Sequence, residues 1–466
     1  MRCIATYFLL ITMTVARFAL SDDLVTGEVL DALFAHEDYS NSTWSCYVSD
    51  IETGETVYEL NSDKGMVPAS NQKLYVAVAA LLGLGPDYRS STHFFARGPL
   101  KNGILRGDIV IHGYGAITLT SRYPRSQTAS VKNVVLNEQL DELVAKLKAA
   151  GVINVLGGLV ADNRGWTDMA FNEHYPSATA LLFNENTLDI HVEDGILFHC
   201  PGRLGVFRLH PTVLAGGKQL RLEKDGKPSD TIRVGLAEDN DDYWRLVSPL
   251  GPSYYLDHLM TALESRGVFV AGNPLPAARE HQKTPLFRLD GLPLGSLVST
   301  MLSHSDNLRS EIVFLNLGYE QRGKATYKNA AKACKDLLEA QGMSLKRYKA
   351  VDGSGLSPRN RVSTRETVEL LKTMSVKPHF ELFKSALPVA GVSGTLARHL
   401  AAETIKGRVR AKTGTIDGVK ALSGYTDSAE GRRLAFSIIC NDSPGSDRCW
   451  KTLESVLVLL VGVNGE

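Results

Sequence analysis

The chain has 466 residues, of which 44% are hydrophobic and 22% are charged. This length exceeds the size at which one hydrophobic core keeps growing, so we expect two or more domains, and the apolar content excludes a disordered or fibrous chain. The 51 basic residues balance the 51 acidic residues, and no basic stripe is interleaved with aromatic residues, so nucleic acid is not an expected partner.

Residues 1–21 have the pattern of an export signal peptide. Arg2 supplies a charged start, residues 3–16 form an apolar run, and small residues precede the polar pair at 22–23. The alternative is an uncleaved anchor, but the apolar run is short for a bilayer span and Arg17 interrupts it. We therefore expect an exported protein of the periplasm or cell envelope, with no transmembrane segment after the signal peptide.

The cysteines do not predict a disulfide scaffold. Of six cysteines, Cys3 leaves with the signal peptide, so an odd number remains for an oxidising compartment. Cys440 ends a predicted strand and Cys449 begins the predicted last helix, so a bridge between them is one possibility. The alternative is that both are buried free thiols. No spacing suits zinc, and neither a metal nor an organic cofactor is expected.

The elements before residue 91 are a helix, a hairpin and a second helix. The first helix is predicted over residues 24–38, and the hairpin strands over residues 44–50 and 55–60, which turn at a Thr-Gly pair. A strongly apolar helix then begins at Ser70 and continues to about residue 82, where glycines stop it.

From residue 91 to 285 the pattern changes to short alternating strands, Gly-rich turns and one amphipathic helix near residues 136–150. Helical patterns return at residues 294–302 and 308–317. A capping box then starts a helix at Ser363 that runs through residue 374.

Three strands and a helix close the chain, with the strands at residues 409–413, 421–426 and 434–440 and the helix at residues 447–461. Strands at both chain ends predict one sheet built from both termini. The expected organisation is a signal peptide over residues 1–21, one domain formed by residues 22–90 and 286–466, and an inserted region over residues 91–285 with two subdomains.

Three short strings, far apart and in a fixed order, carry the chemical signal. Residues 70–73 read Ser-Asn-Gln-Lys, residues 305–307 read Ser-Asp-Asn, and residues 412–414 read Lys-Thr-Gly. Together they match the signature of serine acyl-transferring enzymes that recognise penicillin. Each string alone is weak evidence because its residue types are common. The ordered set is strong evidence.

The first string offers a nucleophile and a base. Ser70 and Lys73 are three residues apart, so on a helix their side chains lie on one face within mutual reach. A helix start at Ser70 also aims unpaired backbone N–H groups at an oxyanion formed there. For Lys73 to accept a proton its pKa must fall, and we expect burial and a neighbouring cation such as Lys412 to lower it.

The other two strings supply a proton relay and substrate contacts. Ser305 offers a second hydroxyl between Lys73 and the leaving amine, and Asn307 offers an amide to a peptide backbone. The third string lies on a predicted strand. Its cation, together with the hydroxyls of Thr413 and of Thr415 that follows the string, suits a free carboxylate, and its glycine lets a substrate approach the strand edge.

With these strings, the sequence resembles the class C low-molecular-mass penicillin-binding proteins, which are exported D-Ala-D-Ala carboxypeptidases and endopeptidases. The resemblance covers nearly all of the chain after the signal peptide. It also rests on residues 302–308 with Glu311, and on residues 351–357, 387–396 and 421–425. The long separation of the first two strings differs from class A β-lactamases, which keep them closer together.

The resemblance implies an α+β fold, in which a serine transpeptidase/β-lactamase-like domain has an antiparallel sheet flanked by helices and carries a large, mostly β inserted region. It implies a serine DD-peptidase that acts on peptidoglycan stem peptides ending in D-Ala-D-Ala through an acyl-enzyme, without a cofactor, and that β-lactams inhibit covalently. The implied catalytic residues are Ser70, Lys73 and Ser305, and the implied substrate-binding residues are Asn307, Lys412, Thr413, Gly414 and Thr415. Backbone N–H groups of Ser70 and Thr415 would form the oxyanion hole.

The chain departs from the family pattern in the inserted region, where Ala116 and Ile117 replace the usual Asp-Pro pair. Two other functions are weighed against the peptidase. One is a β-lactamase, which needs a positioned carboxylate and water for fast deacylation. The other is a non-catalytic scaffold that binds cell-wall peptide or a partner protein, for which a nucleophile and base at helical spacing have no use.

Overall fold

The structure is a computed structural model that describes residues 22–121, 129–166, 178–193, 196–201, 208–213, 231–236, 243–247, 251–275 and 283–462. The predicted signal peptide lies outside the described residues. No helix in the described ranges combines the length and the apolar character that a membrane crossing requires.

The centre of the fold is a five-stranded antiparallel sheet with strand order β18-β19-β20-β1-β2. Its strands are β1 (Thr43–Asp50), β2 (Thr56–Leu60), β18 (Arg410–Ile416), β19 (Val419–Asp427) and β20 (Arg433–Asn441). Strand β1 pairs with β20 along its whole length, so the two ends of the chain meet in one sheet. This confirms the sheet that the sequence predicts and leaves β18, which carries the Lys-Thr-Gly string, at one edge.

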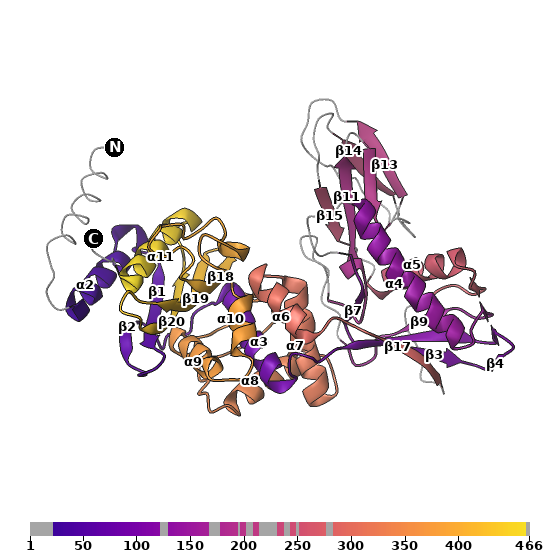
Figure 1. Ribbon diagram of the computed structural model, residues 1–466, viewed down its shortest axis with the longest axis horizontal. Helices are drawn as coiled ribbons and strands as arrows, with labels where there is room; N and C mark the ends of the chain where they lie inside the picture. The colour runs from indigo at the N-terminus through magenta and orange to yellow at the C-terminus, as the bar shows by residue number, and fades with distance from the viewer. Residues whose placement is uncertain are drawn as a thin grey trace.

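Alternation along the strands assigns the two faces of the sheet. On β20, Phe436 and Ile438 pack into a core with α2 (Asp22–Phe34) and α11 (Ser446–Val461). Ala435 and Ile439 point the other way, into a larger core that contains residues of six further helices. These are α3 (Gln72–Gly83), α6 (Leu294–Ser303), α7 (Asn307–Arg322), α8 (Tyr327–Glu339), α9 (Thr364–Ser375) and α10 (Phe380–Ala386). Figure 1 shows α2 and α11 on one side of the sheet and α9 and α10 on the other.

The predicted first helix is wrong at its end. Helix α2 ends at Phe34, and a separate 3-10 turn follows over Glu37–Tyr39. The break comes at His36, whose backbone turns to φ −55° and ψ 140° and whose ring accepts a hydrogen bond from the N–H of Asp38. A side chain that caps a new turn competes with continuation of the helix.

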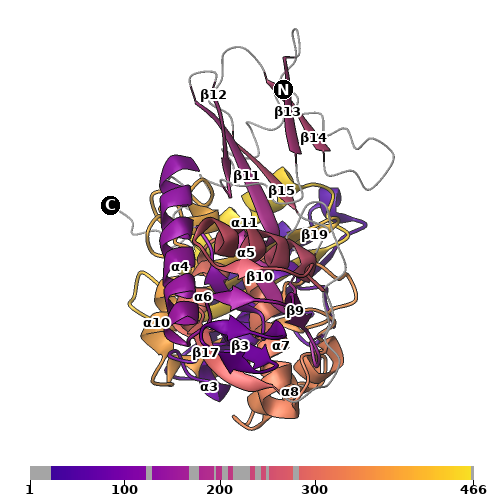
Figure 2. The same ribbon diagram turned by 90° about the vertical axis from the view of Figure 1, so that its right-hand side faces the viewer.

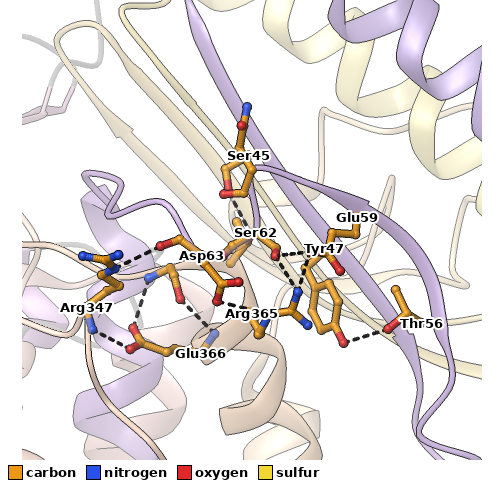
Figure 3. A network of polar contacts seen from close by, with 12 residues as sticks. Ser45, Tyr47, Thr56, Glu59, Ser62, Asp63, Arg347, Arg365 and Glu366 are labelled. Atoms are coloured by element: carbon orange, nitrogen blue, oxygen red, sulfur yellow. Dashed lines mark hydrogen bonds and ion pairs between the residues drawn. The ribbon is translucent and has the colours of Figure 1, made fainter.

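A polar network fixes the β1–β2 hairpin to the start of α9 (Figure 3). Arg365 contacts Glu59 and Asp63 and lies over the ring of Tyr47, 4.4 Å from its centroid. Glu366 accepts hydrogen bonds from the backbone of Ser363 and of Arg347, which completes the predicted capping box. The hairpin and the helix are therefore joined by side chains that the capping sequence alone does not reveal.

The inserted region leaves and returns on paired strands, since β3 (Ser91–Arg97) pairs antiparallel with β17 (Thr284–Asp290). Strand β17 thus runs past the predicted boundary at residue 285. The other described strands of the region are β4 (Leu100–Lys101), β5 (Ile104–Leu105), β6 (Asp108–Gly113), β7 (Ala116–Leu119), β8 (Asn154–Val155), β9 (Leu159–Asp162), β10 (Leu181–Phe183), β11 (Thr187–Glu193), β12 (Ile196–Cys200), β13 (Arg208–Val213), β14 (Thr231–Leu236), β15 (Tyr243–Val247) and β16 (Phe269–Val270). Figures 1 and 2 show the region beside α6 and α7, with β11 to β15 projecting from it.

The inserted region also contains two helices, where the sequence predicted one. Helix α4 (Ala129–Ala149) matches the prediction but begins earlier. Helix α5 (Pro252–Ser265) was missed because its aromatic start favours a strand. Its buried residues nevertheless recur at helical spacing, from Leu256 through Leu259 to Leu263. Ala116 and Ile117 are buried in β7, which pairs in parallel with β10.

The described cysteines are all free and buried in the structure. Cys440 and Cys449 therefore stand as thiols rather than as the bridge that was one of the two possibilities. Cys449 lies 3.0 Å from the hydroxyl of Ser443. Burial raises the pKa of the Cys46 and Cys334 thiols, which is expected of small apolar core residues.

Candidate active site

Ser70 lies in a tight turn rather than inside the helix. The 3-10 turn Ala69–Asn71 directly precedes α3, and Ala69 has φ +46°, an uncommon conformation for a residue with a side chain. The strand that carries Gly414 packs closely on this turn, because a Cβ at Gly414 would meet the carbonyl oxygen of Pro68 at 2.8 Å. The glycine of the third string therefore brings β18 next to Ser70.

Lys73 holds the centre of the site. Its Nζ donates hydrogen bonds to Ser70 Oγ at 2.9 Å, to Asn307 Oδ1 at 2.8 Å and to the carbonyl oxygen of Ser354 at 2.6 Å. The lysine is fully buried in the first turn of α3, one helical turn from the serine. The first two strings of the sequence thus meet at one nitrogen atom.

Burial lowers the pKa of Lys73 to about 8. Three carboxylates oppose this fall, with Glu311 the strongest, followed by Asp306 and Asp352. The sequence expectation of burial is confirmed, but Lys412 is not among the causes of the shift. A lysine with a pKa near neutral pH can accept a proton from a serine hydroxyl.

Ser305 and Asn307 flank the start of α7. Asp306 between them is the N-cap residue, and its carboxylate accepts a hydrogen bond from the N–H of Arg309 at 2.9 Å. Ser305 has φ +57°, so the chain turns sharply just before the helix. This turn lets Ser305 and Asn307 both reach the site, where they contact the two lysines.

Lys412 connects the second and third strings. Its Nζ donates to Ser305 Oγ at 2.9 Å and to the carbonyl oxygen of Thr413 at 2.8 Å. The residue is fully buried, and its pKa falls well below the ordinary value because of burial and because of the charge on Lys73. Each lysine therefore has a serine hydroxyl as a partner.

Ser70 and Ser305, the hydroxyl partners of the two lysines, line a cleft of about 370 Å³. Its lining residues are Ser70, Ser305, Thr395, His399, Thr413, Thr415, Lys420, Ser446, Asp447 and Trp450. Ser70, Ser305 and the β18 residues Thr413 and Thr415 line one space, while Lys73, the partner of Ser70, is fully buried. Such an arrangement can carry out nucleophilic acyl transfer without a metal, and the described residues hold no cluster of metal ligands.

The sequence matches the D-Ala-D-Ala carboxypeptidase 3 (S13) family over residues 27–184 and 231–460. The chain belongs to this family. A D-alanyl-D-alanine carboxypeptidase of Actinomadura sp. strain R39 is 28% identical over 460 residues, covering 90% of this chain and 81% of the relative. The chain is therefore a serine-type D-Ala-D-Ala carboxypeptidase of the S13 family.

Solved structures agree with this S13 fold. The crystal structure of penicillin-binding protein 4 (dacB) from Haemophilus influenzae superposes with a TM-score of 0.76 at 22% identity, covering 93% of this chain and 99% of that chain. The same protein complexed with a β-lactam has a TM-score of 0.73 at 22% identity, covering 92% and 98%. At this identity the likeness establishes the fold, which confirms the α+β sheet flanked by helices with its inserted region.

The structure brings together all the residues that the sequence singled out and adds others to this S13 site. The sequence indicates Glu311 only through the family resemblance. Its buried carboxylate accepts hydrogen bonds from the N–H groups of Gly353 and Ser354, which fixes the carbonyl that Lys73 contacts. Burial, together with Asp352, raises the pKa of Glu311 to about 7. The far wall of the cleft, formed by Lys420, His399 and Trp450, gives no sequence signal, because these residues come from a strand, a loop and a helix that share no motif.

Proposed function

We propose that this S13 carboxypeptidase removes the terminal D-Ala of peptidoglycan stem peptides, with Ser70 as the acylated nucleophile. One observation carries the proposal. The hydroxyl of Ser70 lies 2.9 Å from the amine of Lys73, a buried lysine whose pKa is lowered to about 8. A base within hydrogen-bond reach and with a pKa near neutral is what a serine needs to attack a carbonyl.

In the acylation step, Lys73 Nζ takes the proton of Ser70 Oγ as that oxygen bonds to the carbonyl carbon between the D-Ala residues. The C–N bond then breaks as Ser305 Oγ gives a proton to the departing amine. Ser305 is reprotonated by Lys73 and Lys412, which together carry the proton taken from Ser70. Lys412 holds Ser305 for this transfer at 2.9 Å. Water then attacks the ester carbonyl carbon as Lys73 Nζ takes a proton from it, and the C–O bond to Ser70 breaks as Lys73 gives that proton to Ser70 Oγ.

Substrate binding follows from the positions of the remaining groups. Asn307 uses its carbonyl oxygen on Lys73, which leaves its amide nitrogen for a peptide carbonyl. Strand β18 is at the sheet edge, so an extended peptide can pair along it. Thr413 and Thr415 offer hydroxyls to the terminal carboxylate, with Gly414 between them and Lys412 behind. The oxyanion would bind the N–H groups of Ser70 and Thr415.

The place of action follows from the sequence pattern and the substrate. Cell-wall stem peptides lie outside the cytoplasm, so the predicted signal peptide over residues 1–21 and an exported location fit together. The division into a catalytic domain over residues 22–90 and 286–466 and an inserted region over 91–285 is part of the same proposal. Cleavage of cross-links uses the same chemistry with a larger leaving group.

The deciding experiment is intact-mass spectrometry of the protein without its signal peptide, incubated with benzylpenicillin beside Ser70→Ala. We expect one drug adduct on the parent protein and none on the variant. We also expect release of D-Ala from a stem pentapeptide by the parent only.

Each other outcome contradicts the proposal in a distinct way. No adduct with intact drug would favour a non-catalytic scaffold, and no adduct with hydrolysed drug would favour a β-lactamase. An adduct that persists in Ser70→Ala would place the nucleophile at another residue.

A further inference from the structure

The cleft contains a cation that the three strings do not include. Lys420 lies on β19 directly across from Thr415 of β18. Its Nζ donates to Thr415 Oγ1 at 2.9 Å and to Ser446 Oγ at 2.9 Å, and it lies over the ring of Trp450, 5.0 Å from the centroid. Lysine, threonine and tryptophan all line the cleft that holds Ser70.

A free carboxylate at the end of the substrate needs a positive partner, and Lys412 is poorly placed for it. Lys412 is fully buried and directs its ammonium to Ser305 Oγ and to the Thr413 carbonyl oxygen. Burial lowers the pKa of both Lys412 and Lys420, and the nearby Lys73 adds to the effect at Lys412 alone, where the pKa falls well below the ordinary value. Thr413 is only 8% exposed, whereas Thr415 is exposed in the cleft.

We propose that Lys420 is the positioning cation for the terminal carboxylate of the substrate and acts through the hydroxyl of Thr415. Because Thr415 Oγ1 accepts a hydrogen bond from Lys420, its own O–H is left to donate to a ligand. A hydroxyl polarised by an ammonium binds an anion more strongly than an isolated hydroxyl does. The inference rests on the proposed function, since it concerns the same substrate.

The surroundings hold Lys420 in this position. Trp450 stacks on His399 with 4.3 Å between ring centroids and 7° between ring planes, which gives the lysine a rigid wall. Of the three N–H donors of the ammonium, hydrogen bonds to described residues occupy two. Asp447, in the first turn of α11, also lines the cleft and is the one carboxylate among its lining residues. Asp447 supports the charge on Lys420 but repels a bound anion.

The test compares a β-lactam that has a free carboxylate with the same molecule without that charge. The second-order rate constants of acylation are measured for benzylpenicillin and for its methyl ester, and their ratio is the carboxylate preference. Lys420→Met and Lys420→Gln should lower this ratio about tenfold, the effect of losing one partly screened charge interaction. Lys420→Arg, which keeps the charge, should stay within about threefold of the parent.

Two further variants control for net charge and for the local field. Lys451→Met removes the same charge from an exposed residue next to Trp450 and should leave the ratio unchanged. Asp447→Asn removes the repelling carboxylate and should raise the ratio. The same pattern should appear in KM rather than kcat for a D-Ala-D-Ala peptide, because the charge binds the carboxylate before and after the attack alike.

A ratio that stays at the parent value in both Lys420→Met and Lys420→Gln would overturn the inference, whatever happens to the absolute acylation rates. So would an equal fall in Lys451→Met. Failure of the proposed function is distinguishable, because the parent protein would then not be acylated at Ser70 by either compound.

Discussion

Glu185 of the inserted region accepts hydrogen bonds from both terminal nitrogens of the Arg309 guanidinium, at 2.7 Å and 3.2 Å. Arg309 lies in the first turn of α7 and also contacts Asp306, the residue between Ser305 and Asn307, at 3.3 Å. The side chains of Glu185, Arg309 and Asp306 are all buried. A buried charge cluster therefore joins the inserted region to the wall of the cleft that carries Ser305.

Removal of the Glu185 charge should weaken both the fold and the reaction. Loss of one partner of a buried ion pair lowers the free energy of unfolding by about 3–5 kcal/mol when the other charge is left isolated. Arg309 keeps Asp306 as a partner, so we expect Glu185→Gln to lower the free energy of unfolding by about 2 kcal/mol. The acylation rate should fall about tenfold because Ser305 and Asn307 lose their support. Urea unfolding and the rate of penicillin acylation measure the two effects.

A double-mutant cycle separates the interaction between Glu185 and Arg309 from non-specific destabilisation by each substitution. Arg309→Met added to Glu185→Gln removes the uncompensated cation, so the double variant should be more stable than the sum of the single changes predicts, by about 1–3 kcal/mol. Strict additivity of the two changes in unfolding free energy would show that the two side chains do not act together.

The pH dependence of acylation should report on Lys73. Only the neutral amine can accept the proton of Ser70, and the pKa of Lys73 is lowered to about 8. The acylation rate should therefore rise about tenfold per pH unit below about pH 7 and level off above about pH 8. Glu311, whose pKa is raised to about 7, interacts with Lys73. The apparent pKa of the rate profile therefore belongs to Lys73 and Glu311 together.

The variant Glu311→Gln tests how the charge of Glu311 shifts the pKa of Lys73. The carboxylate of Glu311 is the strongest of the charges that raise the pKa of Lys73. Its removal should move the rise in the acylation rate to lower pH, while the amide oxygen can still accept a hydrogen bond from the Gly353 or Ser354 N–H. A profile that moves to higher pH would contradict the assignment of Lys73 as the base.

The sequence predicted the parts of the molecule that are governed by local patterns. The strand-like runs at 421–426 and 434–440 and the capping box at Ser363 are encoded within a few residues, and all three are confirmed. Helix α5 was missed because its aromatic residues have strand propensity, and tertiary burial overrides that preference.

The far wall of the cleft could not be predicted for a different reason. Lys420, His399 and Trp450 come from a strand, a loop and a helix that only the fold brings together. Their contact depends on long-range packing and leaves no periodic or spaced signal. Glu185 is similar, because its partner Arg309 is in a different part of the chain.

The start of α9 should depend on Glu366. Its carboxylate accepts backbone hydrogen bonds from Arg347 at 2.6 Å and from Ser363 at 3.2 Å (Figure 3). Glu366→Ala leaves both N–H groups without this acceptor, so we expect a loss of about 1–3 kcal/mol in unfolding free energy. Glu366→Gln keeps an acceptor oxygen and should lose less than half of that amount. Equal losses in the two variants would show that charge, not hydrogen bonding, sets the contribution.

The glycine at 355 should be essential for the geometry at Ser70. Gly355 has φ +86°, and a Cβ there would lie 1.9 Å from the carbonyl oxygen of Ala69 and 3.0 Å from the backbone nitrogen of Ser70. Gly342 has φ +87°, and a Cβ at that position would meet nothing within 4 Å, so Gly342→Ala measures the conformational cost alone, about 1 kcal/mol. Gly355→Ala should cost more than that and lower the acylation rate at least about a hundredfold, because the backbone that carries Ser70 must move. Equal losses of stability with unchanged acylation in both variants would show that Ser70 does not depend on this contact.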